Sequence, residues 1–260
     1  MTVDLSINMM TSLTCTMCQL TCQLKDDRMP HVDHTFDING LDGPLGQRVY
    51  SVLRTNILEM VLKPGAILRK GALCEQLGVS RSPIAEALGR LSSDGLVDII
   101  PQSATRVSQF SMAELLEENF LREAVEVAAV ARVATDRTGN QLTRLSRNLR
   151  FQALLVEDED FQGFFEADLE FHELILSFTG FPKVNLVAEE MTLQLRRARK
   201  LMLPQPGRPA QAVSEHQEIL KAIEAKDAAA ARRAMAQHLR QLIQRIVPLE
   251  REHPEYFRTT

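Results

Sequence analysis

The sequence predicts a mainly α-helical protein in which a small domain with three helices and a hairpin precedes an all-helical bundle. Three observations predict this. Residues 111–248 show only helical periodicity, interrupted by short breaks. Ala, Leu, Arg and Glu dominate the second half of the chain, and these residues favour helices. Two strand-like runs separated by a short turn lie between residues 96 and 110. At 260 residues the chain is long enough for two domains.

Composition and charge narrow the class of protein. Hydrophobic residues make up 45% and charged residues 25%, an ordinary globular balance. No apolar run reaches the length of a membrane span, and no basic start leads into an apolar signal core. We therefore expect a cytoplasmic protein with no membrane partner. The net charge of -4 argues weakly against nucleic acid, but residues 45–108 carry eight Lys/Arg against five Asp/Glu. This net-basic segment is where a polyanion would bind.

Residues 1–43 show no usable periodicity and end in a loop signal, so we predict a disordered leader. Cys15, Cys18, His31 and His34 have the spacing C-x2-C-x12-H-x2-H, which is similar to a zinc finger. The match is incomplete, because the gap between the His residues is one short and Pro30 interrupts the expected helix. An over-extended start, with Met29 as the true first residue, is the alternative interpretation.

Residues 44–110 form the first predicted domain. Apolar spacing predicts helices beginning at Leu45 and Lys70, and a third with Ser82 as N-cap and Pro83 as its first residue. The hairpin follows, with strands predicted at Leu96–Ile100 and Thr105–Phe110. Three helices and a hairpin in this order make a winged helix-turn-helix, which places the start of its third helix in the DNA major groove.

A purely structural packing module is the alternative for this domain. Its net-basic balance and the polar opening of the third helix favour DNA binding. The wing would lie along the DNA backbone or minor groove, with one arginine as its contact. We predict DNA contacts from seven residues: Arg48, Arg69, Ser80, Arg81, Ser82, Arg90 and Arg106.

The second predicted domain covers residues 111–248, and residues 249–260 are predicted to be a tail. Six antiparallel helices of this length make a bundle. The predicted helices are 111–137, 139–156, 159–178, 183–202, 209–225 and 228–247. Ser111 and Glu114 have the spacing of a capping box, and Asp227 is typical of a helix N-cap.

One Asp and three His are spaced so that they converge within this bundle. Asp168 and His172 stand four apart, which puts both on one helix face. His216 lies 11 residues before Asp227, and His238 lies 11 residues after it. Two helices folded back at Asp227 would bring both imidazoles to the same level. Three imidazoles and a carboxylate suit a divalent transition metal, with Zn favoured and Ni or Mn as alternatives, although buried His and Asp residues can also be purely structural.

The segment LKPGAILRKGALCEQLGVSRSPIAEALGRLSSDGLV resembles the winged helix of GntR-type bacterial transcription regulators. The helical half, with its D-x3-H and two later His residues, resembles the FadR/FCD branch of that family. The resemblance covers about residues 45–247. It implies a homodimeric regulator with a helical effector domain of six or seven helices that binds a small organic acid, and it implies the same four metal ligands.

The resemblance has consequences for contacts and specificity. Arg122, on the first bundle helix, is our candidate for pairing a carboxylate of the effector; an exposed pair with Glu118 or Glu126 is the alternative. The basic cluster Arg196, Arg197 and Arg199 is expected to place at least two members in solvent.

The chain departs from the family at several positions. The family usually has Arg where this chain has Ala85 and often where it has Gly89. The turn of the wing usually carries Arg and Gly in the family, and Ser103 and Ala104 stand there in this chain. The family's usual Asn at a later helix start is Phe181 here.

These features together predict a metabolite-responsive DNA-binding transcriptional regulator, most simply a repressor and not an enzyme. Its predicted partners are double-stranded operator DNA, a small carboxylate effector and a second copy of the chain. A metal-dependent enzyme acting on a small acid is one alternative, since three His and an Asp can activate water. A degenerate regulator with weakened DNA recognition is another, because the arginines usual at residues 85 and 89 are missing.

Overall fold

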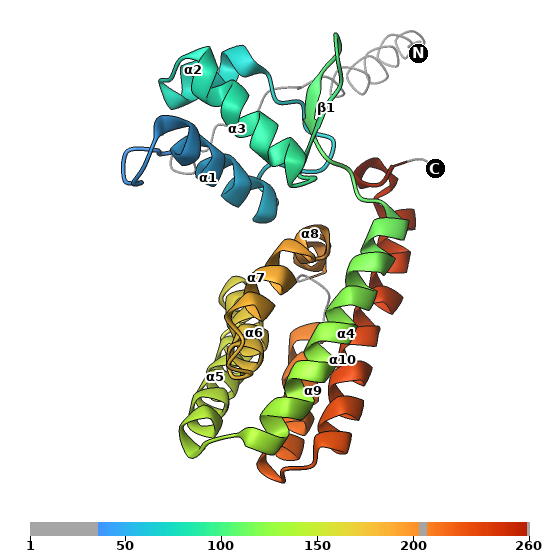
Figure 1. Ribbon diagram of the computed structural model, residues 1–260. Coiled ribbons are helices and arrows are strands. Elements are labelled where there is room, and N and C mark those ends of the chain that lie inside the picture. Colours follow the sequence, from blue (N-terminus) through green and yellow to red (C-terminus); the bar gives the residue numbers. More distant parts are fainter. Residues whose placement is uncertain (1–35, 203–206, 259–260) are drawn as a thin grey trace, which may run out of the picture. The chain divides into compact units, whose positions relative to one another are not determined.

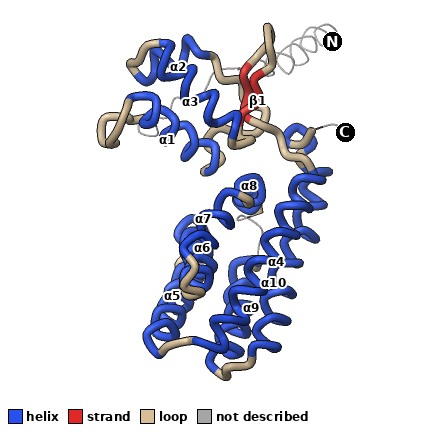
Figure 2. The backbone as a smooth tube through the Cα atoms, viewed as in Figure 1, coloured by secondary structure: helices blue, strands red, loops and turns tan. Residues whose placement is uncertain are grey.

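The computed structural model describes residues 36–202 and 207–258. The first 35 residues, with the cysteine and histidine pattern, therefore lie outside the described part. Phe36 and Ile38, at the end of the segment predicted as a leader, are buried. Within the described ranges the chain is mostly helical, with a single two-stranded sheet (Figure 1; Figure 2).

The first domain is a winged helix-turn-helix. Its elements are α1 (Leu45–Leu58), α2 (Lys70–Leu77), α3 (Arg81–Ser93), β1 (Val97–Ile99) and β2 (Thr105–Val107). Gly78 ends α2 in the left-handed conformation that glycine adopts without strain. The strands pair antiparallel, with Asp98 opposite Arg106. Apolar side chains from all three helices fill the core, and Leu53, Ile84 and Leu88 are fully buried.

The start of α3 differs from the prediction. The helix begins at Arg81 with Ser80 as N-cap residue, and the Ser80 side chain makes no cap hydrogen bond. Ser82 therefore lies inside the helix and not at its N-cap. Pro83 is the third helical residue, where its missing N–H costs nothing, because the amides of a first turn have no intrahelical partner.

The second domain is a bundle of helices. Its elements are α4 (Met112–Asp136), α5 (Gly139–Glu157), α6 (Phe161–Ser177), α7 (Pro182–Glu190), α8 (Leu193–Leu201), α9 (Arg208–Glu224), α10 (Ala228–Glu252) and the short η1 (Pro254–Tyr256). The long helices α4 and α10 run side by side (Figure 1). The Asp227 side chain accepts a hydrogen bond from the Ala230 amide, as predicted for an N-cap. Among the described helices, none is both long and apolar enough to cross a membrane.

One predicted helix of the bundle is two helices in the structure. The helix expected over 183–202 is broken at Met191 and Thr192 into α7 and α8, although no Gly or Pro marks the break. The carboxylate of Glu118, on α4, accepts the amides of Gln194 and Leu195 and so caps the second piece. A cap supplied from another helix leaves no local signal in the sequence.

Residues 249–258, predicted as part of a tail, pack against the start of the bundle. Helix α10 continues through Pro248 to Glu252, although an internal proline costs about 3 kcal/mol in a helix. Burial of Leu249 and Phe257 against Phe110 favours this continuation. The backbone of Phe110 also pairs with that of Phe257 in an isolated bridge, which ties the end of the chain to the start of the bundle.

Candidate metal centre and neighbouring cavity

The structure places the four predicted ligands on three helices of the bundle. Asp168 and His172 lie one turn apart on α6, His216 lies on α9 and His238 on α10. All four side chains are buried. The turn at Asp227 folds α9 and α10 against each other, which brings His216 and His238 opposite one another.

The three imidazoles converge through the same ring nitrogen. His238 Nε2 lies 3.3 Å from His172 Nε2 and 3.3 Å from His216 Nε2. Asp168 lies at the edge of this group, with its Oδ1 3.7 Å from His216 Nε2. The three imidazoles thus form a cluster that could hold a metal ion, as a transition-metal site requires, whereas Asp168 stands beside this cluster and pairs with Arg199.

The other ring nitrogen of each histidine is held by a partner from a different helix. His172 Nδ1 lies 2.5 Å from a carboxylate oxygen of Glu126, on α4. His238 Nδ1 lies 2.7 Å from an oxygen of Glu215, on α9. His216 Nδ1 lies 2.9 Å from the amide oxygen of Gln152, on α5. An acceptor at Nδ1 fixes the proton there and leaves Nε2 as a lone pair, which is the tautomer that binds a metal.

These partners are themselves fixed. Arg122 Nε donates to Glu126 over 2.6 Å, and Arg208 donates to Glu215 over 3.2 Å. The Gln152 amide group donates to Asn148 Oδ1 and to the Ala167 carbonyl, so its oxygen must face His216. Sequence spacing gave no signal for Glu126 and Gln152, because their helices are far from those of the histidines in the chain. Glu215 directly precedes His216, so the turn at Asp227 that brings the two imidazoles together also brings Glu215 to His238.

Electrostatics favour the protonation states of metal ligands. Burial lowers the pKa of His216 well below its usual value. Burial also lowers the pKa of His238 to about 4, against the opposing hydrogen bond to Glu215. Burial alone would raise the pKa of Asp168, but Arg199 and the three imidazoles outweigh it and hold that pKa well below its usual range. At neutral pH these two imidazoles are neutral and the carboxylate is ionised, so the donor set fits a divalent transition metal.

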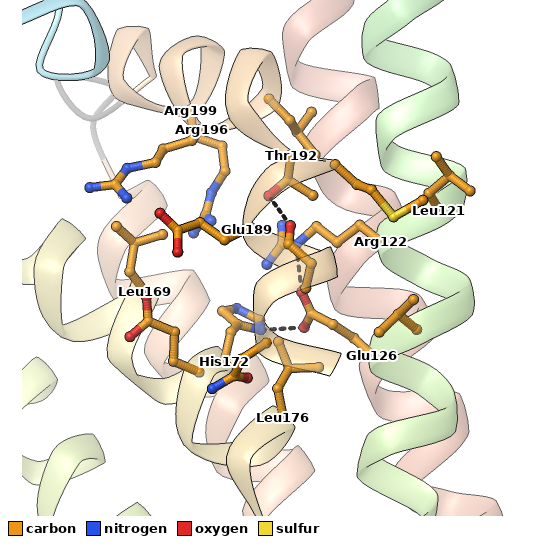
Figure 3. A pocket seen from close by; sticks show the side chains of 16 residues that line it. Leu121, Arg122, Glu126, Leu169, His172, Leu176, Glu189, Thr192, Arg196 and Arg199 are labelled. Carbon is orange, nitrogen blue, oxygen red and sulfur yellow. Dashed lines mark hydrogen bonds and ion pairs between the residues drawn. The ribbon is translucent and has the colours of Figure 1, made fainter. Parts of the chain in front are cut away.

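A cavity of about 220 Å³ lies beside His172 (Figure 3). One part of its wall is apolar, with Leu121, Val125 and Leu195 among the lining residues. The charged lining residues are Arg122, Glu126, Glu173, Glu189, Arg196 and Arg199. Figure 3 shows Glu126 joined to both Arg122 and His172, so the cavity wall and the imidazole cluster share one hydrogen-bonded network.

Arg122 lines the cavity and pairs with Glu126 four residues on. Both side chains of this pair are buried, in contrast to the exposed pair of the alternative interpretation. Arg122 also fixes the carboxylate that holds His172.

The arginine cluster on α8 departs from the expectation that at least two members face solvent. Arg197 is fully buried, and the side chains of Arg196 and Arg199 are 28% and 13% exposed. Contacts of α8 with α1, α4 and α10 cover what would be free faces on an isolated helix. Arg197 donates to the Ser108 carbonyl over 3.0 Å, and Arg199 pairs with Asp168.

The residues predicted to contact DNA fall into two groups. Arg69, just before α2, and Ser80, Arg81 and Ser82, at the start of α3, are exposed. The other three are held by the protein. Arg48 donates to the Ile38 carbonyl, Arg90 stacks on the Tyr50 ring 4.1 Å from its centroid, and Arg106 is half-buried in β2.

Comparisons with known proteins agree with both halves of the chain. Residues 45–107 match the family model "Bacterial regulatory proteins, gntR family", and residues 119–241 match the FCD domain. An uncharacterized HTH-type transcriptional regulator from an unstable DNA locus of Streptomyces ambofaciens is 34% identical, over 81% of this chain and 89% of its own. The HTH-type transcriptional repressor RspR of Escherichia coli is 29% identical, over 82% of this chain and 94% of its own. The solved structure of E. coli McbR/YncC has a TM-score of 0.67 and 26% identity, covering 80% of this chain and 99% of that one.

Proposed function

The chain belongs to the GntR family of bacterial transcription regulators and carries an FCD domain, and from this premise we propose that it is a cytoplasmic, homodimeric repressor that senses a small organic acid at a metal centre. The observation that supports the metal centre best is the convergence of three Nε2 atoms whose Nδ1 atoms are each held by an acceptor. Zinc is the metal we propose, with nickel or manganese as alternatives, because imidazole suits these ions better than Ca²⁺ or Mg²⁺.

The cavity beside the metal centre is the proposed effector site. Its guanidinium groups, Arg122, Arg196 and Arg199, suit a carboxylate, and its apolar wall suits a short carbon chain. A metal ion with an open position supplies a further Lewis-acidic contact for a carboxylate or hydroxyl oxygen. The volume of about 220 Å³ is suited to a small metabolite.

Helix α8 provides a physical route from this cavity to the DNA-binding domain. Arg196 and Arg199 line the cavity, whereas Gln194, on the same helix, donates to the Gly95 carbonyl at the base of the hairpin over 2.6 Å. Glu189, at the end of α7, also lines the cavity and pairs with Arg54 of α1 at 3.0 Å. A ligand that moves α8 or engages Glu189 would change the contacts that hold the winged helix, and so its fit to operator DNA.

The homodimer follows from the way a winged helix reads DNA. One recognition helix reaches one half-site, so a pair of half-sites requires two copies of the chain. The exposed opening of α3, with Ser80, Arg81 and Ser82, is the surface we propose for base and phosphate contacts.

A gel-shift assay with the promoter next to the protein's own gene tests this function. We expect salt-sensitive specific binding in the nanomolar range that a cognate carboxylate changes. The variant Arg81→Ala should weaken the complex, whereas Arg233→Ala, an exposed residue on α10, should not. Absence of binding with and without every carboxylate tried would contradict the proposal.

A regulator that has lost DNA recognition is the second candidate, and one observation favours it. Ala85 and Gly89 lie on the exposed face of α3, where the family usually has or often has arginine. A side chain at Gly89 would meet open space, so both positions can accept a long residue. If the natural chain fails to bind DNA and the double variant Ala85→Arg/Gly89→Arg binds it, this second function replaces the first.

A further inference from the structure

Arg199 lies between the candidate metal centre and the cavity. Its side chain is 13% exposed and forms an ion pair with Asp168 Oδ2. It is also one of the residues that line the cavity. Burial lowers the pKa of Arg199 to about 10, against the opposing charge of Asp168, so the guanidinium is protonated at neutral pH. Within the described residues, Asp168 is the one carboxylate that pairs directly with this buried cation.

The carboxylate of Asp168 faces Arg199 and the imidazole cluster at once. One oxygen pairs with Arg199, and the other lies 3.7 Å from His216 Nε2, on the side where the three imidazoles converge. A single negative charge compensates a guanidinium well in a buried site, but it cannot fully compensate a guanidinium and a divalent ion together. When Asp168 shares its charge with an ion, the buried Arg199 is left needing a second anion.

The other guanidinium groups of the cavity are in different circumstances. Arg122 keeps its own buried carboxylate, Glu126, which lies 2.6 Å away and bonds His172 through its other oxygen. Arg196 is more exposed and lies 3.8 Å from Glu59. Arg199 alone among these three shares its carboxylate partner with the candidate metal centre, so its charge balance depends on what that centre holds.

We propose that Arg199 couples the two binding events of this site: a divalent ion on Asp168 and the imidazoles frees the Arg199 guanidinium to bind the carboxylate of the effector. The inference rests on the proposed function and deepens it by naming the residue that makes acid binding depend on the metal. The coupling must be reciprocal, so the acid must raise the affinity for the metal by the same factor.

Isothermal titration calorimetry of the full-length protein tests this inference. Zinc is titrated in a carboxylate-free buffer with and without succinate, and succinate is titrated with and without saturating zinc. For the wild-type chain we expect each ligand to raise the affinity of the other by roughly tenfold, within the usual range of couplings between sites. If succinate raises the zinc affinity by the same factor as zinc raises the succinate affinity, the two sites are linked. A titration of zinc into succinate without protein measures their association in solution.

Variants at the coupling residue separate its role from those of its neighbours. In Arg199→Gln we expect the coupling factor to fall clearly below the wild-type value, to what a direct contact between metal and acid supplies. The affinity for zinc alone should stay or rise, because a competing cation on Asp168 is gone. Arg199→Lys retains the charge and should keep part of the coupling. Arg240→Gln removes an exposed arginine that pairs with Glu123 on the surface, and it serves as the matched control with full coupling.

The outcomes distinguish this inference from the function on which it rests. An Arg199→Gln variant with undiminished coupling would overturn the inference and leave the metal-dependent sensor intact. Zinc and succinate that bind the wild-type chain independently would overturn the inference and the metal contact to the acid, but not the DNA-binding function. A wild-type chain that binds no zinc would overturn both. The wild-type coupling is measured without any variant, so the test stands even if Arg199→Gln does not fold.

Discussion

The two domains of this chain use their interiors differently. The core of the winged helix-turn-helix consists of aliphatic side chains such as Leu53, Ile84 and Leu88, and its candidate DNA contacts lie on the surface. The bundle instead buries ionisable and polar side chains at its centre. The buried ionisable and polar side chains of the bundle include Arg122, Glu126, Gln152, Asp168, His172, Arg197, His216 and His238.

This difference shows where each domain carries its chemistry. An apolar core stabilises a recognition surface without taking part in recognition, so surface substitutions should change DNA binding and leave the fold intact. A buried polar network costs desolvation energy and is stable only when every member has its partner. The bundle should therefore be sensitive to single changes at its centre, in ligand binding and in stability alike.

The largest effect should follow the loss of one imidazole. His216→Ala removes one of three convergent ring nitrogens, and we expect zinc affinity to fall by more than 100-fold, beyond the range expected for an outer-shell partner. Calorimetry or competition with a chelator measures this. Replacing the exposed His253, which lies at the end of α10, should leave zinc affinity unchanged. Equal affinities in wild type and His216→Ala would refute the metal centre.

The partners of the imidazoles should have the next largest effect. Glu215→Gln weakens the acceptor for His238 Nδ1, and we expect zinc affinity to fall about 10- to 100-fold. The control Glu218→Gln changes an exposed glutamate one turn further along α9, and it should bind zinc normally. A Glu215→Gln variant as tight as wild type would mean that the imidazole is oriented by packing alone.

The pH dependence of stability should reveal the buried imidazoles in the presence of a chelator. The unfolded imidazole, with an ordinary pKa of 6.5, takes up a proton that folded His238, with a pKa of about 4, does not. Protons therefore favour the unfolded chain, and stability is lost as pH falls below about 6.5. Between pH 7.5 and 5 we expect His238 to lower the free energy of unfolding by about 2 kcal/mol.

The measurement is a comparison of urea denaturation for wild type and His238→Asn at the two pH values. A comparison is needed because burial raises the pKa of Glu118 to about 7, which stabilises the folded chain as pH falls over part of the same range. The variant should lose the His238 contribution and keep that of Glu118. Identical pH dependence in both proteins would contradict the low pKa of His238.

The smallest of these effects is expected on the surface of the other domain. Arg81→Ala should lower operator affinity about tenfold and, if the contact is to phosphate, reduce the salt slope by about one. Its free energy of unfolding should match that of wild type, because Arg81 is exposed at the start of α3. Fluorescence anisotropy at several salt concentrations measures the operator affinity and the salt slope, and urea denaturation measures the free energy of unfolding. A large loss of stability in Arg81→Ala would contradict the view that this surface residue serves DNA binding and contributes little to the fold.

The predicted ligand set shows how far sequence spacing reaches. Asp168 and His172 share a helix face because they are four apart, and His216 and His238 meet because both stand 11 residues from the turn at Asp227. Each step depends on helix periodicity or on one identifiable turn. The partners Glu126 and Gln152 could not be predicted in the same way, since their helices meet the histidines only through bundle packing. Glu215, next to His216, meets His238 through the same turn at Asp227.

Helix boundaries show the same limit. The sequence predicted a continuous helix through Met191 and Thr192 because no breaker stands there, but Glu118 of α4 caps the second piece. It predicted that the last bundle helix ends at residue 247, just before Pro248, but α10 continues to Glu252 and buries Leu249 in one apolar cluster with Phe110. In both cases a long-range contact outweighed a local propensity.

The sequence by itself determined the two domains, the helix-turn-helix with its hairpin, and the residues whose spacing brings imidazoles together, because these depend on local periodicity and turn chemistry. Only the tertiary structure decided what surrounds those residues. It paired Arg199 with Asp168, gave each imidazole its acceptor, buried Arg197 and partly covered Arg196 and Arg199. Charge compensation in a buried site depends on distances between helices, and no local pattern encodes those distances.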